Sequence, residues 1–190
     1  METADLLAAA FVDDPLHVWA FPGDRDRRLR RLRWLMGALV EALADTCLID
    51  RDDAGVAVWR PPEVSRPLPP GVALRHRIAW APVRLGIPAV LRLRAAGVDV
   101  ERQAASDTAG RPHWTLELVA TDPEARGRGH GSRLVERGAR RAAATGCVVY
   151  AVTHNPANLP WFRRRGFRVA SVRSLRRGPR VWGLVCEPDL

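Results

Sequence analysis

The feature that most constrains this chain is a glycine-rich loop between a strand and a helix. Residues 113–121, HWTLELVAT, have the apolar composition of a buried strand, and a helix is expected over 131–145. Between them, residues 125–134 read ARGRGHGSRL, in which three glycines alternate with Arg128 and His130. Backbone N–H groups at such a junction can point at an anion, because glycine has no Cβ to block its approach. The sequence therefore predicts a phosphate-binding loop at the start of this helix.

Two common phosphate loops are excluded by the residues present. A Walker loop needs a lysine after its last glycine, and the 30 basic residues of this chain are all arginine. The dinucleotide fingerprint needs a third glycine where this chain has Ser132, and an acidic residue about 20 positions further on. Between Glu136 and Glu187 there is no aspartate or glutamate. Both nucleotide-binding motifs are therefore ruled out.

The remaining pattern is Arg/Gln-x-x-Gly-x-Gly/Ala, which Arg126, Gly129 and Gly131 fill. It resembles the acetyl-CoA loop of the GNAT acetyltransferase superfamily. The flanking LELVATDPEARGRGHGSRL resembles the strand-loop-helix core of that family, and NPANLPWFRRRGF is similar to its Asn-x-x-x-Tyr helix followed by Gly-Phe. The segments AAAFVDDPLHVWAFP and RGPRVWGLVCEP resemble the puromycin-type small-molecule acetyltransferases, so the resemblance extends from Leu6 to Pro188.

The resemblance implies an α/β fold (α+β) with a central mixed sheet flanked by helices, the GNAT-like acyl-CoA N-acyltransferase fold. We expect one domain over residues 1–190, with acceptor-pocket helices and a first hairpin in 1–100, the acetyl-CoA-binding core in 113–168 and a C-terminal hairpin in 169–190. Family members usually begin with a strand, whereas this chain starts directly with the helix-like METADLL. The first strand is therefore expected to be missing, unless the true start lies upstream.

The same resemblance assigns the residues that hold acetyl-CoA, which is expected as the co-substrate, without a metal. Backbone groups of a bulged central strand, expected around Val119–Thr121, pair with the pantetheine arm, and the glycine loop cradles the pyrophosphate. The expected coenzyme-binding residues are Val119, Ala120, Thr121, Arg126, Gly127, Arg128, Gly129, His130, Gly131, Ser132 and Asn158. The arginine-rich stretch from Arg137 to Arg180 favours the additional 3′-phosphate of coenzyme A.

Acetyl transfer to an amine also needs a proton acceptor, because an alkyl ammonium has a pKa of about 10.4. Glu117 on the central strand and His154 at the end of the adjacent strand are the two catalytic candidates. The alternative role for Glu117 is a salt-bridged or solvent-facing strand residue, and for His154 a cap of the following loop. Phe162 stands where the family has its tyrosine, and Val152 where it often has glutamate. We therefore expect a slow enzyme or an unusual proton donor.

The rest of the chain is predicted from periodicity and turn residues. An amphipathic helix is expected over 24–45, because the leucines from Leu29 to Leu43 keep helical spacing. Segments 16–22 and 72–97, rich in tryptophan and leucine, are expected to form the acceptor pocket. The other expected elements are a helix over 3–11, a loop over 16–22, hairpins over 46–60 and 167–187, an irregular proline-rich stretch over 61–71, helical pieces over 72–97 interrupted by Pro82 and Pro88, a polar loop over 101–112, a strand over 147–153 and a short helix over 158–165 capped by Asn158.

Charge and composition limit the partners. The net charge of +9 favours an anionic ligand. A nucleic-acid partner is not expected. The arginines of 24–37 form the solvent-exposed face of the amphipathic helix, and aromatic residues do not alternate with basic ones. The three cysteines, Cys47, Cys147 and Cys186, are too scattered to form a metal site. No signal peptide is recognised, and no apolar run approaches the length of about 20 residues that a membrane-spanning helix needs. The expected location is the cytoplasm without a membrane partner, and a homodimer is left open.

These observations predict an N-acetyltransferase that moves the acetyl group of acetyl-CoA to a primary amine of a small, largely apolar molecule by direct attack. The alternative left open is a catalytically degenerate GNAT module that binds acyl-CoA as a sensor or as a partner-binding subunit. Phe162 and Val152 are the residues that favour this alternative.

Overall fold

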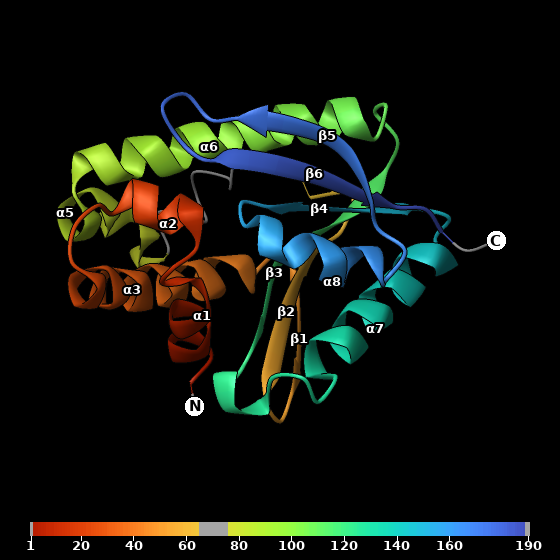
Figure 1. The fold of residues 1–190 in the computed structure, drawn as a ribbon, viewed down its shortest axis with the longest axis horizontal. Coiled ribbons are helices and arrows are strands. Elements are labelled where there is room, and N and C mark those ends of the chain that lie inside the picture. The colour runs from red at the N-terminus through yellow and green to blue at the C-terminus, as the bar shows by residue number, and fades with distance from the viewer. Residues whose placement is uncertain (1, 65–75, 189–190) are drawn as a thin grey trace.

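The sheet of this protein is mixed, and its strands do not follow one another in chain order. The computed structural model describes residues 2–64 and 76–188. Six strands form one sheet in the order β1-β2-β3-β4-β6-β5 (Figure 1). The strands are β1 Leu48–Asp52, β2 Gly55–Arg60, β3 His113–Thr121, β4 Val148–Thr153, β5 Arg168–Ser174 and β6 Arg180–Cys186. Strands β3 and β4 pair in parallel, whereas the other neighbouring pairs are antiparallel.

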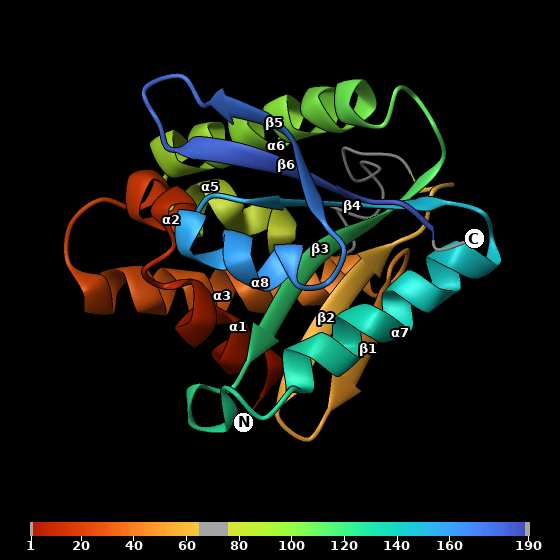
Figure 2. The same cartoon turned by 45° about the vertical axis from the view of Figure 1, so that its right-hand side comes forward.

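Helices cover both faces of the sheet. They are α1 Thr3–Phe11, α2 Pro15–Ala20, α3 Arg25–Leu43, α5 Ala81–Leu85, α6 Ile87–Asp107, α7 His130–Ala144 and α8 Leu159–Arg163, with 3-10 turns at Arg77–Trp80, Pro123–Ala125 and Pro156–Asn158. In Figure 2, α7 and α8 lie in front of the sheet, and α6 runs behind β5 and β6. Within the described ranges, no helix combines the length and apolar composition that a bilayer crossing requires. The expected mixed sheet flanked by helices is confirmed, and α1 is the first element of the described residues.

The helix that follows the glycine loop packs directly on the sheet. A Cβ at Gly138 of α7 would overlap the indole ring of Trp59 on β2, so glycine is required for this approach. Trp59 is fully buried and shares a core cluster with Leu134 of α7 and Leu184 of β6. This close packing fixes the start of α7 beside the end of β3, where the glycine loop joins them.

Residues 16–22 are predicted as a loop, but most of them form α2. Asp14 precedes this helix, and its carboxylate accepts a hydrogen bond from the Leu16 N–H at 2.9 Å. Pro15 stands in the first turn, where a missing N–H costs no helical hydrogen bond. The Asp-Pro pair is therefore a helix start, and the loop prediction was wrong because it treated the pair only as a helix stop.

Residues 101–112 are also predicted as a loop, but α6 continues through them to Asp107. Their polar side chains are partners of polar groups on the sheet. Gln103 Nε2 donates to Ser171 Oγ at 2.8 Å, and Ser171 Oγ donates to Asp107 at 2.8 Å. The Tyr150 hydroxyl donates to the same carboxylate at 3.2 Å. The loop prediction failed because polarity was read as exposure, whereas these side chains are satisfied inside.

Smaller differences concern prolines and a cap. Pro82 and Pro88 do not interrupt helices but stand in the first turns of α5 and α6. Asn158 precedes α8 without capping it, because its amide Nδ2 donates to Thr153 Oγ1 at 3.2 Å. Most of the segment predicted to be irregular, 61–71, and the start of 72–97 lie outside the described residues.

Candidate active site

Two parallel strands diverge at the centre of the sheet. Strands β3 and β4 are paired as far as Leu116 and Ala151. Both continue beyond that pair, to Thr121 and Thr153, and Figure 2 shows them opening apart as a V. Backbone groups of β3 that face the opening have no strand partner in the described part of the chain. An extended ligand can bond to such an edge as an added strand does.

A β-bulge lies at the point of divergence. Trp59 of β2 pairs with Leu116, and the preceding residue of β2 pairs with Leu118, so Glu117 is the additional residue of β3. The resemblance places this bulge around Val119–Thr121, and the structure corrects that position to Glu117. A bulge leaves one residue outside the ladder and changes where its neighbours point. The first candidate base is therefore itself the bulged residue.

The loop after β3 presents a row of backbone N–H groups. Gly127 and Gly129 have φ values of +80° and +85°, a conformation that favours glycine. Gly129 is the N-cap of α7, and no side chain caps that helix. The N–H groups of Gly127 and of residues 129–132 have no acceptor among the described residues. Together with the dipole of a 15-residue helix, these donors have the chemistry to bind an anion.

The space beside the loop is open. A Cβ built at Gly127 meets nothing within 4 Å, so the loop faces open space there. At Gly131, a Cβ would lie 3.1 Å from Thr121 Oγ1 and 3.4 Å from Trp161, so glycine lets α7 start against the end of β3. The donor set and the open space together suit the diphosphate of a nucleotide-containing coenzyme.

Basic side chains surround the loop. Arg126 and Arg128 are exposed, and neither forms an ion pair with any described residue. Arg165 lies 3.8 Å from the ring centroid of Trp161 and donates to Ser132 Oγ at the start of α7. Burial lowers the pKa of the Arg165 guanidinium, so an anion beside it would be stabilising. Sequence reasoning missed this stacked pair, because it lies far along the chain from the glycine motif.

His130 ties the loop to the first hairpin. Its Nδ1 lies 3.0 Å from Oδ2 of Asp52 at the end of β1, and Arg133 Nη2 lies 3.1 Å from the same nitrogen. Burial raises the pKa of Asp52, but the Ala54 N–H and His130 outweigh it and hold that pKa below its usual value. The His130 side chain is therefore turned toward the hairpin, and its contribution to an anion site is its backbone N–H.

Glu117 is held in a buried ion pair. Its Oε1 lies 2.6 Å from Arg60 Nε on β2, and Arg60 Nη2 lies 2.9 Å from Oε1 of Glu101 on α6. The side chains of Arg60 and Glu117 are 8% and 14% exposed. Burial lowers the pKa of Arg60, but the two carboxylates outweigh it and raise that pKa above its usual value. This arrangement is the salt-bridged role that the sequence left open for Glu117.

His154 follows β4 directly and, like His17 of α2, is buried. Residue exposures are 8% for His154 and 6% for His17. Burial lowers the pKa of each imidazole to about 4, and the charge of His154 also lowers that of His17. Nε2 of His154 and Nδ1 of His17 have no hydrogen-bond partner in the described part of the chain. Both rings are therefore neutral at pH 7.

The tyrosine position of the family pattern is filled by a core residue. Phe162 is buried, with ring centroids 4.9 Å from Trp161 and 5.2 Å from Phe167. The only tyrosine in the sequence, Tyr150, is buried against α6 and bonded to Asp107. No tyrosine hydroxyl of this chain therefore stands at the family position.

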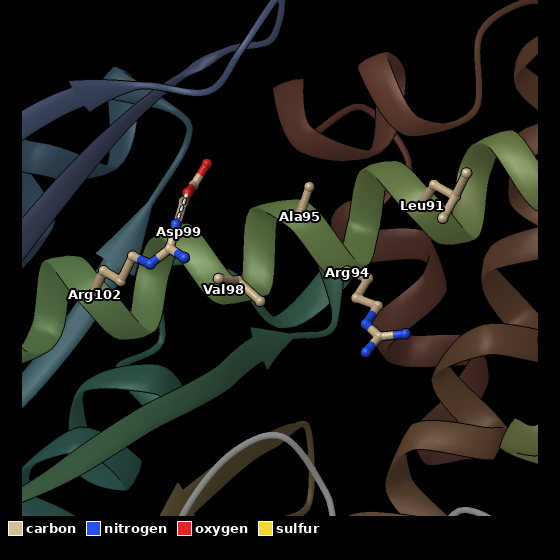
Figure 3. A pocket seen from close by; sticks show the side chains of 6 residues that line it. All are labelled: Leu91, Arg94, Ala95, Val98, Asp99 and Arg102. Atoms are coloured by element: carbon tan, nitrogen blue, oxygen red, sulfur yellow. Dashed lines mark ion pairs between the residues drawn. The ribbon is translucent and has the colours of Figure 1, made fainter.

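A shallow depression of about 310 Å³ lies along the outer side of α6 (Figure 3). It is lined by Leu91, Arg94, Ala95, Val98, Asp99 and Arg102. All six residues come from one helix, and none of the candidate site residues lines it. This hollow is thus separate from the strand divergence.

The comparisons with known proteins agree with this geometry. The model of the acetyltransferase (GNAT) family matches residues 93–167. A histone acetyltransferase HPA2 and related acetyltransferase from Corynebacterium glutamicum aligns with a TM-score of 0.63 at 22% identity, over 98% of this chain and 90% of that one. Arylalkylamine N-acetyltransferase 2 from Aedes aegypti aligns with a TM-score of 0.56 at 11% identity, over 98% and 94%. A polyamine N-acetyltransferase from Drosophila melanogaster gives 0.50 at 18% identity, over 97% and 94%. The chain therefore has the fold of the GNAT acetyltransferases, and its segment 93–167 matches the sequence model of that family.

Proposed function

We propose that this protein transfers the acetyl group of acetyl-CoA to a primary amine of a small molecule. One arrangement carries the proposal: β3 and β4 diverge beyond Leu116 and Ala151, and the N–H groups of residues 129–132 have no acceptor in the described part of the chain. The open edge of β3, which could bond to an amide-containing arm, thus lies next to the N–H groups that could hold a diphosphate. The match of 93–167 to the GNAT family model supports the same activity.

Acetyl-CoA suits both features. The backbone N–H groups of residues 129–132 would hold its diphosphate, with Arg126 and Arg128 beside them. The open edge of β3 at Val119–Thr121 would bond to the amides of the pantetheine arm. When bound, the coenzyme supplies an acetyl thioester, whose sulfur leaves readily because a thiol has a pKa of about 8.5.

The protein would hold the amine and receive its proton. The amine nitrogen bonds to the acetyl carbon, the carbon–sulfur bond breaks with its electron pair on sulfur, and the proton lost by nitrogen ends on that sulfur. We infer that His154, and not Glu117, first accepts this proton, since Glu117 is bonded to Arg60 while His154 Nε2 has no described partner. With a pKa lowered by burial to about 4, His154 also gives the proton up readily.

The acceptor is proposed to be small and largely apolar. Two structural neighbours are named for amines, a polyamine and an arylalkylamine N-acetyltransferase, which supports an amine as acceptor. The segment AAAFVDDPLHVWAFP, whose likeness to puromycin-type acetyltransferases motivates that branch, forms α1 and α2. The proposed acceptor site is therefore built partly from these two helices.

Thiol release tests the proposal. With saturating acetyl-CoA and a panel of small primary amines, we expect release that depends on the amine. His154→Gln should lower kcat/KM by about 10²–10⁴, the usual worth of a general base, while Glu117→Gln should leave the pH profile unchanged. If Glu117→Gln instead flattened the acidic limb of the pH profile and His154→Gln kept full activity, Glu117 would be the base.

One observation favours a second candidate function, binding of acyl-CoA without transfer. Phe162 replaces the family tyrosine and is buried among Trp161 and Phe167, so no phenol assists the leaving sulfur. Phe162→Tyr separates the two functions. An enzyme should keep its rate or gain up to about tenfold, because acid assistance by water already covers part of the need. A binding module should release no thiol in either form despite coenzyme binding, and a clear loss of rate would mean that residue 162 does not face the sulfur.

A further inference from the structure

A half-buried arginine, Arg165, lies against the first turn of α7. It follows α8, and its Cζ lies 3.8 Å from the ring centroid of Trp161, so the guanidinium is stacked on the indole. Its Nη1 donates to the Trp161 carbonyl, and its Nη2 donates to Ser132 Oγ in the first turn of α7. Cζ2 of Trp161 is 3.4 Å from the position of a Cβ built at Gly131. Two separate contacts therefore place the stacked pair beside the start of this helix.

The charge of this arginine is not balanced by a carboxylate. Arg165 forms no ion pair with any described residue. The sequence has no aspartate or glutamate between Glu136 and Glu187, and Glu187 is itself held in two ion pairs. Burial and the charge of Arg164 lower the pKa of Arg165 more than Glu136 raises it. A charge that is partly removed from water without a partner is costly, and an anion beside Arg165 would relieve that cost.

The same guanidinium has hydrogen bonds left to donate. Each Nη carries two N–H bonds and uses one of them, and Nε carries one more. Nε is buried and has no partner in the described part of the chain. The N–H groups of residues 129–132 also have no acceptor there, and Ser132 is bonded to the guanidinium. Donors from two distant segments thus meet at the start of α7, where a ligand with several anionic oxygens can accept from both.

We propose that Arg165 binds the diphosphate of the coenzyme and that it is the arginine on which coenzyme affinity depends most. The inference rests on the proposed acetyl transfer, in which acetyl-CoA occupies this loop. Trp161 and Ser132 hold the guanidinium in place before the ligand arrives, so little side-chain entropy is lost on binding. Arg126 and Arg128 are exposed and must be ordered by the ligand. Each of these two should therefore contribute less than Arg165.

The coenzyme offers two phosphate sources, the diphosphate and the 3′-phosphate. The contact with Ser132 places the guanidinium at the first turn of α7, where the backbone N–H groups suit the diphosphate. A planar guanidinium also matches neighbouring phosphate oxygens with parallel N–H bonds. The diphosphate is therefore the assigned group, and the 3′-phosphate is the alternative that the experiment separates.

Calorimetric titration with CoA and dephospho-CoA, which lacks the 3′-phosphate, tests the assignment. Arg165→Met should raise the Kd of both ligands about 10-fold or more, as expected for lost hydrogen bonds to a charged group. The ratio of variant to wild-type Kd should shrink between about 50 and about 500 mM NaCl, because salt screens the lost charge. A loss confined to CoA would assign Arg165 to the 3′-phosphate and overturn the inference. A loss that does not respond to salt would mean that Arg165 only holds α8 in place.

Matched variants separate this arginine from its neighbours. Arg163→Met removes the same charge from an exposed position of α8 and should change the Kd of CoA by less than about threefold. Arg126→Met and Arg128→Met should each raise it less than Arg165→Met does. Arg165→Lys should recover part of the affinity, because the charge remains although the planar stack on Trp161 is lost. It also provides the test if Arg165→Met fails to fold, since it should still raise the Kd of both ligands in a salt-dependent way.

The two levels of inference fail differently. If the wild type and Arg165→Met bind CoA equally well, the role of Arg165 is refuted while the proposed acetyl transfer stands. If the wild type binds no CoA at all, the proposed acetyl transfer is refuted, and this inference with it.

Discussion

The two sides of the strand divergence are built in different ways. On the proposed coenzyme side, Gly127, Gly129 and the first turn of α7 form one continuous stretch, and the donors are backbone N–H groups. On the proposed acceptor side, His17 and His154 are both buried, and Arg60 joins Glu101 to Glu117. These side chains come from segments far apart in the sequence. The coenzyme side is therefore local and made of backbone, whereas the acceptor side is long-range and made of side chains.

The difference predicts how each side fails. A local backbone site depends on glycine conformation, so substitutions there should abolish ligand binding while most of the core persists. A long-range side-chain site depends on the packing of several elements, so substitutions there should act on stability and on charge.

The largest effect is expected from Arg60→Leu on the acceptor side. It leaves the buried carboxylate of Glu117 and the half-buried carboxylate of Glu101 without their shared guanidinium, which should cost about 3–5 kcal/mol in the free energy of unfolding. Urea unfolding at pH 7 measures it. The double variant Arg60→Leu with Glu117→Leu should recover a large part of the loss, because only one carboxylate then remains. A single variant as stable as the wild type would show that this ion pair does not hold the acceptor side together.

A smaller effect is expected from Gly129→Val on the coenzyme side. At 100 times its dissociation constant, acetyl-CoA should stabilise the wild type by about 2.7 kcal/mol, and this ligand effect should vanish in the variant. The reason is the φ of +85° at Gly129, which a β-branched residue does not adopt without strain. Gly97→Val is the matched control, since a Cβ there meets nothing within 4 Å and no positive φ is involved. Thermal unfolding with and without acetyl-CoA measures both, and full stabilisation of Gly129→Val would remove the loop from the coenzyme site.

The smallest of the three effects is the pH dependence that His154 confers on stability. Its pKa is about 4 in the folded protein and 6.5 in the unfolded chain, so the unfolded chain binds the proton first as the pH falls. The stability is present above pH 6.5 and is lost as the pH falls toward 4, by about 2 kcal/mol at pH 5. The difference in unfolding free energy between the wild type and His154→Gln should therefore shrink by about 2 kcal/mol from pH 7 to pH 5.

Asp14, on the same side of the molecule, should give the stability a pH dependence opposite to that of His154. Burial raises its pKa from 3.8 to about 6, so its contribution is present below pH 3.8 and is lost as the pH rises through 6. Asp14→Asn should accordingly gain stability relative to the wild type between pH 5 and pH 7. If the stability differences of His154→Gln and Asp14→Asn from the wild type changed with pH in the same direction, this would contradict the burial of one of the two groups.

The elements that could be predicted are those whose signal is local. The buried strand at 113–121, the helix after the glycine loop and the amphipathic helix near 24–45 all agree with β3, α7 and α3 apart from terminal residues. Their periodicity and turn residues lie within one segment. The helix through 101–107 was missed, because its polar residues are satisfied by Tyr150 and Ser171 on strands that no local pattern connects to it.

The sequence by itself determined the glycine loop, the absence of a lysine-containing phosphate motif and the order of the central strand, loop and helix. Only the tertiary structure decided that the bulge lies at Glu117, that Arg60 holds this carboxylate, and that His17 and His154 are both buried. The physical reason is the range of the interactions. Backbone conformation is set by neighbours along the chain, whereas the charge and hydrogen bonding of a side chain are set by whatever the fold brings beside it.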